Sequence, residues 1–512
     1  MIVKNYGCAV FGINATIITV ETNVNPGTAF FMVGLPDSAV KESHQRVGAA
    51  IKNSGLHMPR GREITVNLAP ADIRKEGSAY DLPIAIGMLA GSGQLNPERL
   101  AQYVMMGELS LDGEVRPIKG ALPIALEAKK NGFKGVIVPS ANAREAAIVR
   151  GLETYGVDTL LQVTGFLEGV EQLQRTEVDI EKEFAESSRS YPVDIAEVKG
   201  QENIKRAFEI AAAGGHNVIL IGPPGSGKTM LAKRLPTILP PLTIDEALET
   251  TKIHSVAGKL RKDDSLLSVR PYRNPHHTIS DVALVGGGSF PQPGEISLAH
   301  NGVLFLDELP EFKRTVSAVL RQPLEDRVVT ISRARFSVEF PASFMLVAAM
   351  NPCPCGYYNH PEKDCVCAPG VVQKYLNKIS GPLLDRIDIH IEVTPVPFKE
   401  LSADRQGERS VDMRERVIAA RKVQQDRYAG SNMHCNAQMS NKQVREICRI
   451  DETGQALLAK AMERLGLSAR AYDRILKVSR TIADLGNSPE IRTEHLAEAI
   501  QYRSLDREGW AS

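Results

Sequence analysis

The sequence lacks the long hydrophobic segments, low-complexity tracts and internal repeats that would place it outside the ordinary globular proteins. No apolar run approaches the roughly 20 residues that a membrane helix needs, and no unit of about 20–50 residues repeats. Its start, from Met1 to Cys8, lacks the basic and apolar regions of a signal peptide. We therefore expect a cytoplasmic chain with reduced cysteines and no membrane partner.

An excess of charge of one sign is also missing. The 61 Lys and Arg residues equal the 61 Asp and Glu residues, so the formal net charge is zero. This balance excludes a protein that holds nucleic acid through its overall positive charge, and any polyanion must meet a local basic surface. A length of 512 residues gives roughly three domains.

The hydrophobic pattern changes character along the chain. The first part alternates short β-type runs with helical stretches such as 122–131, which predicts an α/β or α+β domain. A polar, charged stretch over 177–190 is interpreted as a linker. A second α/β pattern follows from Val198 to about Val396, with buried-type strands that indicate a parallel sheet. These strands are expected at 217–221, 302–306 and 343–349.

After Pro397 the β-type runs disappear, and the remaining periodicity predicts a helical bundle. The predicted helices cover 413–428, 441–450, 453–465, 469–485 and 493–502. The sequence thus predicts an α/β domain over 1–175, a linker over 176–192, a parallel-sheet domain over 193–396 and a helical domain over 397–512.

The strongest motif is a glycine-rich segment that directly follows one apolar strand and opens a helix. Its glycines allow backbone N–H groups to surround the α- and β-phosphates of ATP, and the helix N-terminus adds positive potential. Lys228 reaches the β- and γ-phosphate oxygens, and Thr229 holds Mg²⁺. The segment consists of Gly222, Pro223, Pro224, Gly225, Ser226, Gly227, Lys228 and Thr229.

Polar residues follow two further apolar strands. Asp307 and Glu308 end the run Val303–Leu306, and next to a phosphate loop they are expected to bind Mg²⁺ and to polarise the attacking water. Asn351 follows the third strand, where an amide orients the water or contacts the γ-phosphate. A turn-forming Asn before Pro352 is the alternative interpretation.

Two arginines complete a recognisable set of motifs. Arg386 lies in the segment Gly381–His390, and Arg470 follows Ser468 in the helical domain. With the phosphate loop and the two acids, they resemble an AAA+ ATPase. The segments Arg270–Ser280 and Gly294–Gly302 narrow this to the magnesium-chelatase-like branch. Together with the amino-terminal domain, nearly the whole chain resembles the bacterial YifB/ComM proteins.

That resemblance implies a hexameric homo-oligomeric ring that acts in natural transformation as a branch-migration helicase on single-stranded or branched DNA. It implies Asn351 as sensor 1, Arg386 as an arginine finger and Arg470 as a sensor-2-type residue of a helical lid. A guanidinium across a subunit boundary neutralises the transferring phosphoryl group, an effect of about 10³–10⁵ in rate in GTPases. The alternatives are a structural salt bridge of Arg386 with Asp385 or Asp388, and a surface charge for Arg470.

Two segments of the amino-terminal domain resemble the proteolytic domain of Lon proteases. They are Asn67–Pro83 and Gly107–Gly120. Ala79 falls at the nucleophile position and Leu122 at the lysine position, so the Ser–Lys dyad is missing. Ser78 and Lys119 lie close by in sequence, but we expect a scaffold that promotes ring assembly or binds a strand or partner.

Four of the seven cysteines form two Cys-x-Cys pairs in one loop: Cys353, Cys355, Cys365 and Cys367. Four thiolates suit a tetrahedral Zn²⁺, which would be structural because no coordination position stays open. Since Cys-x-Cys is tighter than the usual spacing, reduced loop thiols are the alternative. His276 and His277 lack an evident third ligand, and we interpret them as part of a polar loop near the nucleotide or the pore.

A basic hairpin is predicted over Asp326–Phe340, with β-branched residues on both sides of a polar turn. In ring ATPases such a hairpin projects into the channel, where Arg327, Arg333 and Arg335 would contact DNA phosphates without reading sequence. A solvated turn that carries arginines is the alternative. The competing functions are a chelatase-type ATPase and a protein remodeller, neither of which acts on DNA. The extra domain disfavours the former, and the missing dyad disfavours a protease.

Overall fold

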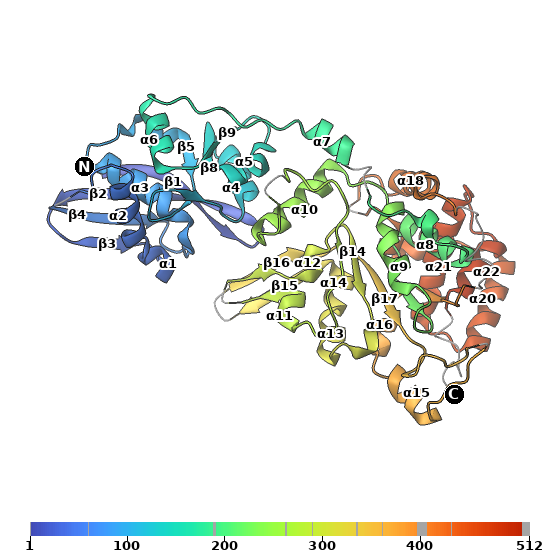
Figure 1. Cartoon of the computed structure of the whole chain (residues 1–512). Helices are drawn as coiled ribbons and strands as arrows, with labels where there is room; N and C mark the ends of the chain where they lie inside the picture. The colour runs from blue at the N-terminus through green and yellow to red at the C-terminus, as the bar shows by residue number, and fades with distance from the viewer. Residues whose placement is uncertain are drawn as a thin grey trace.

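The computed structural model describes residues 2–59, 61–187, 191–261, 264–288, 290–333, 336–360, 362–396, 407–431 and 433–503. Figure 1 shows an amino-terminal lobe in blue and cyan, separate from a larger lobe that contains the rest of the chain. No helix among these described residues is long and apolar enough to cross a membrane.

The amino-terminal lobe is built on a seven-stranded mixed sheet with the order β3-β4-β2-β1-β5-β8-β9. Its first half is antiparallel apart from the β3–β4 pair, and its second half is parallel. The strands are β1 (Ile2–Phe11), β2 (Asn14–Pro26), β3 (Phe30–Val33), β4 (Arg62–Ala69), β5 (Tyr103–Met105), β8 (Gly135–Pro139) and β9 (Glu153–Val157). In β2 and β4 buried residues alternate with less buried ones, as period-2 patterning requires.

Helices cover this sheet and bury one continuous core. They are α1 (Ser38–Lys41), α2 (Ser43–Asn53), α3 (Asp81–Gly91), α4 (Ala121–Lys130), α5 (Ser140–Ala147) and α6 (Leu160–Glu168), with a small hairpin of β6 (Glu108–Leu109) and β7 (Val115–Arg116). The parallel strands alternate with helices α4, α5 and α6, so the predicted α/β class of this region is confirmed.

The stretch interpreted as a linker contains helix α7 (Ile180–Ser187). Asp179 caps the helix by accepting the N–H of Lys182 at 3.1 Å. Ile180 is buried in the core of the amino-terminal lobe, and Glu183 forms an ion pair with Arg144. One apolar residue among many charges was too weak a signal to predict this docked helix.

The larger lobe contains a five-stranded, all-parallel sheet with the order β11-β14-β17-β10-β18. Its strands are β10 (Val218–Ile221), β11 (Tyr272–Arg273), β14 (Val303–Leu306), β17 (Met345–Met350) and β18 (Ile389–Glu392). The three predicted strands are its buried centre, which confirms the parallel sheet. The edge strand β11 has only two residues, too few to produce a pattern in the sequence.

Helices and small hairpins surround this sheet. They are α8 (Glu202–Gly214), α9 (Lys228–Arg234), α10 (Ile244–Val256), α11 (Asp281–Val285), β12 (Gly286–Gly287), β13 (Gln292–Pro293), α12 (Glu295–Leu298), α13 (Arg314–Val319), α14 (Arg321–Asp326), β15 (Val328–Arg333), β16 (Phe336–Pro341), α15 (Pro369–Leu376) and α16 (Gly381–Leu384). The predicted basic hairpin is the antiparallel pair β15–β16. Figure 1 shows it extending from the sheet toward the side of the amino-terminal lobe.

The carboxy-terminal part is helical throughout its described residues, as predicted. Its helices are α18 (Ser410–Arg427), α19 (Asn441–Ile447), α20 (Glu452–Leu465), α21 (Ala469–Leu485) and α22 (Thr493–Gln501). Helices α18 and α21 pack against α8, and one core joins Phe208 of α8, Phe305 of β14 and Ile475 of α21. The helical part is therefore fixed to one face of the parallel sheet.

A buried carboxylate ties these helices to the sheet. Asp388, 1% exposed, accepts the N–H of Asn217 at 3.0 Å and a hydrogen bond from Arg474 of α21 at 2.9 Å. Burial alone would raise the pKa of Asp388, but Arg474 and His216 outweigh burial and hold that pKa well below its usual range. The ionised carboxylate is thus a folded-state contact that stabilises the protein.

We expect Asp388→Asn to lower the free energy of unfolding by roughly 3–5 kcal/mol, because it breaks a buried ion pair. Since the folded-state pKa is depressed, this difference is present above the unfolded Asp pKa of about 3.9 and shrinks as the pH falls below it. Denaturant unfolding across pH measures it. Asp385→Asn, in an exposed pair with Arg470, is the control and costs at most about 1 kcal/mol. Equal effects of the two variants would contradict the assignment.

Candidate functional site

The glycine-rich segment forms a tight loop between β10 and α9. Gly225 and Gly227 have φ of 78° and 88°, in the left-handed region that favours glycine. A Cβ atom on Gly222 would come within 2.3 Å of the Val393 carbonyl oxygen. Ser226 Oγ is buried and has no hydrogen-bond partner within the part of the chain that is described. The loop is thus a backbone cradle with a spare hydroxyl, which fits a phosphate chain.

Lys228 lies buried at the start of α9. Its Nζ donates to the carbonyl oxygens of Gly222 at 2.8 Å and Pro223 at 2.9 Å, and to Asn351 Oδ1 at 3.2 Å. Burial lowers the pKa of Lys228, and the nearby charges of Asp307 and Glu308 oppose this shift. The structure therefore brings together the predicted lysine and the predicted asparagine, which are far apart in the sequence.

The two acids lie at the carboxyl end of β14, beside the loop. Thr229 Oγ1 donates to Asp307 Oδ2 at 2.7 Å, so a hydroxyl and a carboxylate share one position suited to Mg²⁺. Glu308 has a left-handed φ of 53°, and its N–H donates to Asp307 Oδ1 at 3.0 Å. Its carboxylate is more than half exposed, which leaves it accessible to water.

His277 contacts the second acid, a role that the sequence did not assign to it. Its Nδ1 lies 3.0 Å from Glu308 Oε2, and its ring packs edge-on against Phe312. His277 follows β11, the edge strand that pairs with β14, so the sheet order places it beside Glu308. The contact could have been predicted from the position of the histidine pair after β11. A two-residue strand leaves no pattern in the sequence, so this position could not be recognised.

Arg386 lies at the amino-terminal ends of the parallel strands, whereas the glycine-rich loop lies at their carboxyl ends. Asn217, just before β10, donates its side-chain N–H to the Arg386 carbonyl oxygen at 3.0 Å. Gly222 follows the other end of the strand, about 16 Å away at ~3.3 Å per residue. An arginine side chain is shorter than this distance, so Arg386 does not reach the loop of its own chain.

The side-chain partners of Arg386 differ from those considered in the sequence. Its guanidinium forms an ion pair with Glu325 and donates to the Pro382 carbonyl oxygen at 2.5 Å, and its Nε has no partner among the described residues. Asp385 instead accepts a hydrogen bond from Arg470 at 2.7 Å. The alternative of a structural salt bridge for Arg386 is thus found with Glu325 rather than with Asp385 or Asp388, and Arg470 pairs with the residue that precedes Arg386.

The Lon-like segments form a junction between the lobes. Ser78 donates to the Glu108 carboxylate, while a Cβ on Gly258 of the larger lobe would lie 3.0 Å from Lys119 Cε. These contacts hold Ser78 and Lys119 in different environments.

Leu122 marks a contact between the lobes instead. Its N–H donates at 2.8 Å to the buried Glu145, which also accepts the hydroxyl of Ser255 at the end of α10. Burial raises the pKa of Glu145, and the hydrogen bonds from Ser255 and Leu122 partly offset the shift. Figure 1 shows α10 between the two lobes. The start of α4 thus lies at a contact with the larger lobe.

The three basic residues of the hairpin are not grouped together. Arg327 precedes β15, at the base of the hairpin, where its carbonyl oxygen accepts the N–H of Ala342 at 2.7 Å. Burial lowers the pKa of Arg327, and Arg421 of α18 lowers it further. Arg333 ends β15, but its side chain and all of Arg335 lie outside the described residues. Arg327 therefore lies at the base of the hairpin, before β15.

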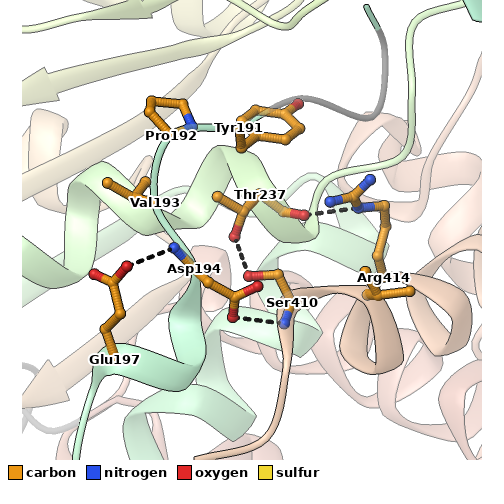
Figure 2. Close-up of a pocket in the computed structure, with 9 residues that line it drawn as sticks. Tyr191, Pro192, Val193, Asp194, Glu197, Thr237, Ser410 and Arg414 are labelled. Carbon is orange, nitrogen blue, oxygen red and sulfur yellow. Dashed lines mark hydrogen bonds between the residues drawn. The ribbon is translucent and has the colours of Figure 1, made fainter. Parts of the chain in front are cut away.

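A separate pocket of about 260 Å³ lies beyond α9, between the start of the larger lobe and α18 (Figure 2). Thr237 and Ser410 hydrogen-bond to each other at 2.7 Å, and Arg414 donates to the Thr237 carbonyl oxygen at 2.7 Å. Asp194 accepts the N–H of Ser410 at 3.0 Å. These polar groups bind one another, so the pocket is a structural junction rather than part of the phosphate site.

The four predicted cysteine ligands lie together in the loop that follows Asn351. Their sulfur atoms are all within 4.8 Å of one another, and all seven cysteines of the chain are free thiols. A group of this composition is able to hold one metal ion.

Three family models match successive parts of the chain. "Magnesium chelatase, subunit ChlI" matches residues 194–401, "Subunit ChlI of Mg-chelatase" matches 20–142, and "Magnesium chelatase, subunit ChlI C-terminal" matches 407–503. Lon protease 2 of Bacillus subtilis is 28% identical over 215 residues, which cover 36% of this chain and 37% of the protease.

Two relatives match almost the full length. Competence protein ComM of Haemophilus influenzae is 46% identical over 506 residues, covering 98% of this chain and 97% of the relative. Uncharacterized protein YifB of Escherichia coli is 46% identical over 505 residues, covering 98% and 96%. The resemblance found in the sequence is thus confirmed, and the chain belongs to the magnesium-chelatase-like AAA+ family that includes ComM and YifB.

Proposed function

We propose that this protein is an ATP-hydrolysing ring motor that acts on DNA as a branch-migration helicase or translocase in natural transformation or recombination. The observation that carries the ring is the position of Arg386, at the sheet edge opposite its own phosphate loop. A chain that separates these two groups needs a second copy to complete each site. The number of six copies comes from the family resemblance.

Each residue of the loop has a role in this proposal. Lys228 exchanges its bonds to backbone carbonyl oxygens for the β- and γ-phosphates, and Ser226 and the loop N–H groups bind the chain of phosphates. Thr229 and Asp307 hold Mg²⁺. An ion held there would supply positive charge that offsets the negative charge developing during phosphoryl transfer.

Water activation falls to Glu308 and Asn351. Glu308 accepts a hydrogen bond from the attacking water and polarises it. His277 fixes the orientation of that carboxylate through the 3.0 Å contact. Lys228 donates to Asn351 as well as to the phosphate loop, so in this proposal the Asn351 amide contacts the γ-phosphate that Lys228 binds. These residues all belong to one copy.

The neighbouring copy supplies the positive charge. Arg386 is paired with Glu325, and Arg470 is paired with Asp385, the residue that precedes Arg386 in the chain. In a ring both guanidiniums would meet the next copy's γ-phosphate, and the acids would hold them until the phosphate arrives. Arg470 would thus serve the neighbour rather than its own chain.

Two observations support the proposed action on DNA. A close relative is called a competence protein, and the β15–β16 turn carries Arg333 and Arg335. Phosphate contacts from such a turn give binding that depends on salt and is insensitive to sequence. A protein remodeller with a peptidase domain is disfavoured, because the Lon-like segments lack the dyad and the second one contacts α10, where the Gly120 N–H donates to the Ser255 carbonyl oxygen at 3.2 Å.

A mixing experiment tests the shared site. Arg386→Ala and Glu308→Gln should each abolish most ATP hydrolysis while ATP still binds. Mixed in equal amounts, the two inactive proteins should regain activity, because Glu308 of one chain meets Arg386 of the other. Steady-state ATPase assays at fixed total protein measure this recovery.

The matched control replaces the Glu308→Gln protein by one that carries both substitutions. No pair of neighbours then has both groups, so mixing with Arg386→Ala should restore nothing. Recovery in this control, or full activity of Arg386→Ala as a monomer, would contradict a site shared between copies.

A second experiment tests the action on DNA. ATPase activity should rise with single-stranded or forked DNA, and the affinity for single strands should fall as salt increases. Replacing Arg333 and Arg335 by Ala should reduce the slope of log K against log salt by about 1.4, which corresponds to two lost phosphate contacts. Fluorescence anisotropy over a salt series measures the slope.

The control for this experiment replaces two exposed lysines of the amino-terminal lobe, Lys52 and Lys130, by Ala. It removes the same charge and should leave the slope unchanged. Absence of DNA binding at low salt, with ATP hydrolysis intact, would favour the chelatase-type or remodelling function over a DNA motor.

A further inference from the structure

The loop between β17 and α15 folds without any helix or strand among its described residues, 351–360 and 362–368. Loops of this length rarely keep one conformation without a further constraint. Cys353 is completely buried, whereas Cys355, Cys365 and Cys367 are partly exposed. This loop contains all four clustered cysteines, and the remaining three are dispersed over the other parts of the chain.

The sulfur atoms have the spacing of a single tetrahedral ion. Cys353 Sγ lies 3.2 Å from Cys355 Sγ and 3.6 Å from Cys365 Sγ, and the last two are 3.5 Å apart. Four sulfurs at about 2.3 Å from one Zn²⁺ would be roughly 3.8 Å from each other. The separations are close to this value, and they are far longer than an S–S bond of about 2.05 Å.

Backbone N–H groups surround the sulfurs. Cys355 Sγ accepts hydrogen bonds from the N–H groups of Tyr357 and Val366. Cys365 Sγ accepts the N–H of Cys367, and Cys367 Sγ accepts the N–H of Cys355. Each Cys-x-Cys pair thus directs its amides at the sulfurs of the group. Such outer hydrogen bonds orient metal ligands and stabilise thiolates.

We propose that Cys353, Cys355, Cys365 and Cys367 hold one structural Zn²⁺, and that this ion fixes the loop against the nucleotide site. Binding releases the four thiol protons and leaves a closed site with four protein ligands. Sulfur ligands in a tetrahedral arrangement favour zinc over the oxygen-binding Mg²⁺.

Two contacts connect the proposed zinc loop with the phosphate loop, and this part of the proposal rests on the proposed ATPase. Gly356 has a φ of 84°, and a Cβ there would come 2.4 Å from Pro224 Cδ. Asn351, two residues before the first cysteine, accepts the hydrogen bond from Lys228. A loop released from its metal would therefore lose its support of Pro224 and of the Asn351 amide.

Metal analysis tests the site itself. The full chain purified without chelator should contain one zinc per chain, and Cys365→Ser with Cys367→Ser should reduce it to background. After mild removal of zinc, Co²⁺ should give the absorption of a tetrahedral thiolate complex. Cys8→Ala, in the amino-terminal lobe, is the matched control and should keep both signals.

Each result decides the question independently of ATP hydrolysis and DNA binding. A chain without zinc that also gives no Co²⁺ absorption overturns the site. The same holds if the four thiols are found as disulfides in freshly purified protein, or if zinc persists in the doubly substituted chain. Zinc that depends on Cys365 and Cys367 supports it even if the motor proposal fails.

A glycine substitution tests the coupling. Gly356→Ala should keep the zinc but displace Pro224, with ATP hydrolysis reduced by up to about 10²-fold and weaker binding of a fluorescent nucleotide. Gly430→Ala is matched, because its φ of 82° carries the same backbone cost while no atom lies within 4 Å of its Cβ position. Unchanged nucleotide binding in zinc-loaded Gly356→Ala would overturn the coupling.

Discussion

The direction of the parallel strands is the constraint on which the rest of this structure depends. Because β14, β17 and β10 are neighbours and run the same way, their carboxyl ends bring Asp307, Asn351 and the loop before Lys228 to one edge. The same direction places Arg386, just before β18, at the other edge. One copy therefore keeps Arg386 apart from its own phosphate loop.

Packing fixes how these halves are held. The helical part shares a core with α8 and the sheet, and the buried Asp388 joins Arg474 of α21 to the sheet edge that carries Arg386. Arg470, one turn earlier on α21, is carried to the same edge and pairs with Asp385. Both arginines are thus held by ion pairs, Arg386 with Glu325 and Arg470 with Asp385.

The phosphate loop is also supported from the side. Its Pro224 lies against Gly356 of the cysteine loop. Its Lys228 donates a hydrogen bond to Asn351, which follows β17 and leads into that loop. On the other side of the molecule, the amino-terminal lobe contacts α10, where the buried Glu145 accepts the hydroxyl of Ser255.

The sequence by itself determined the elements whose signals are local. The spacing from Gly222 to Thr229, the acids after Val303–Leu306, and the helix Ala469–Leu485 could be predicted because their residue types suffice to specify them. Only the tertiary structure decided the partners of Glu308, Arg386 and Arg470, the place of Arg327, and the docking of α7. Those contacts join residues tens to hundreds of positions apart, and which charges meet depends on strand order and helix packing, which no local pattern encodes.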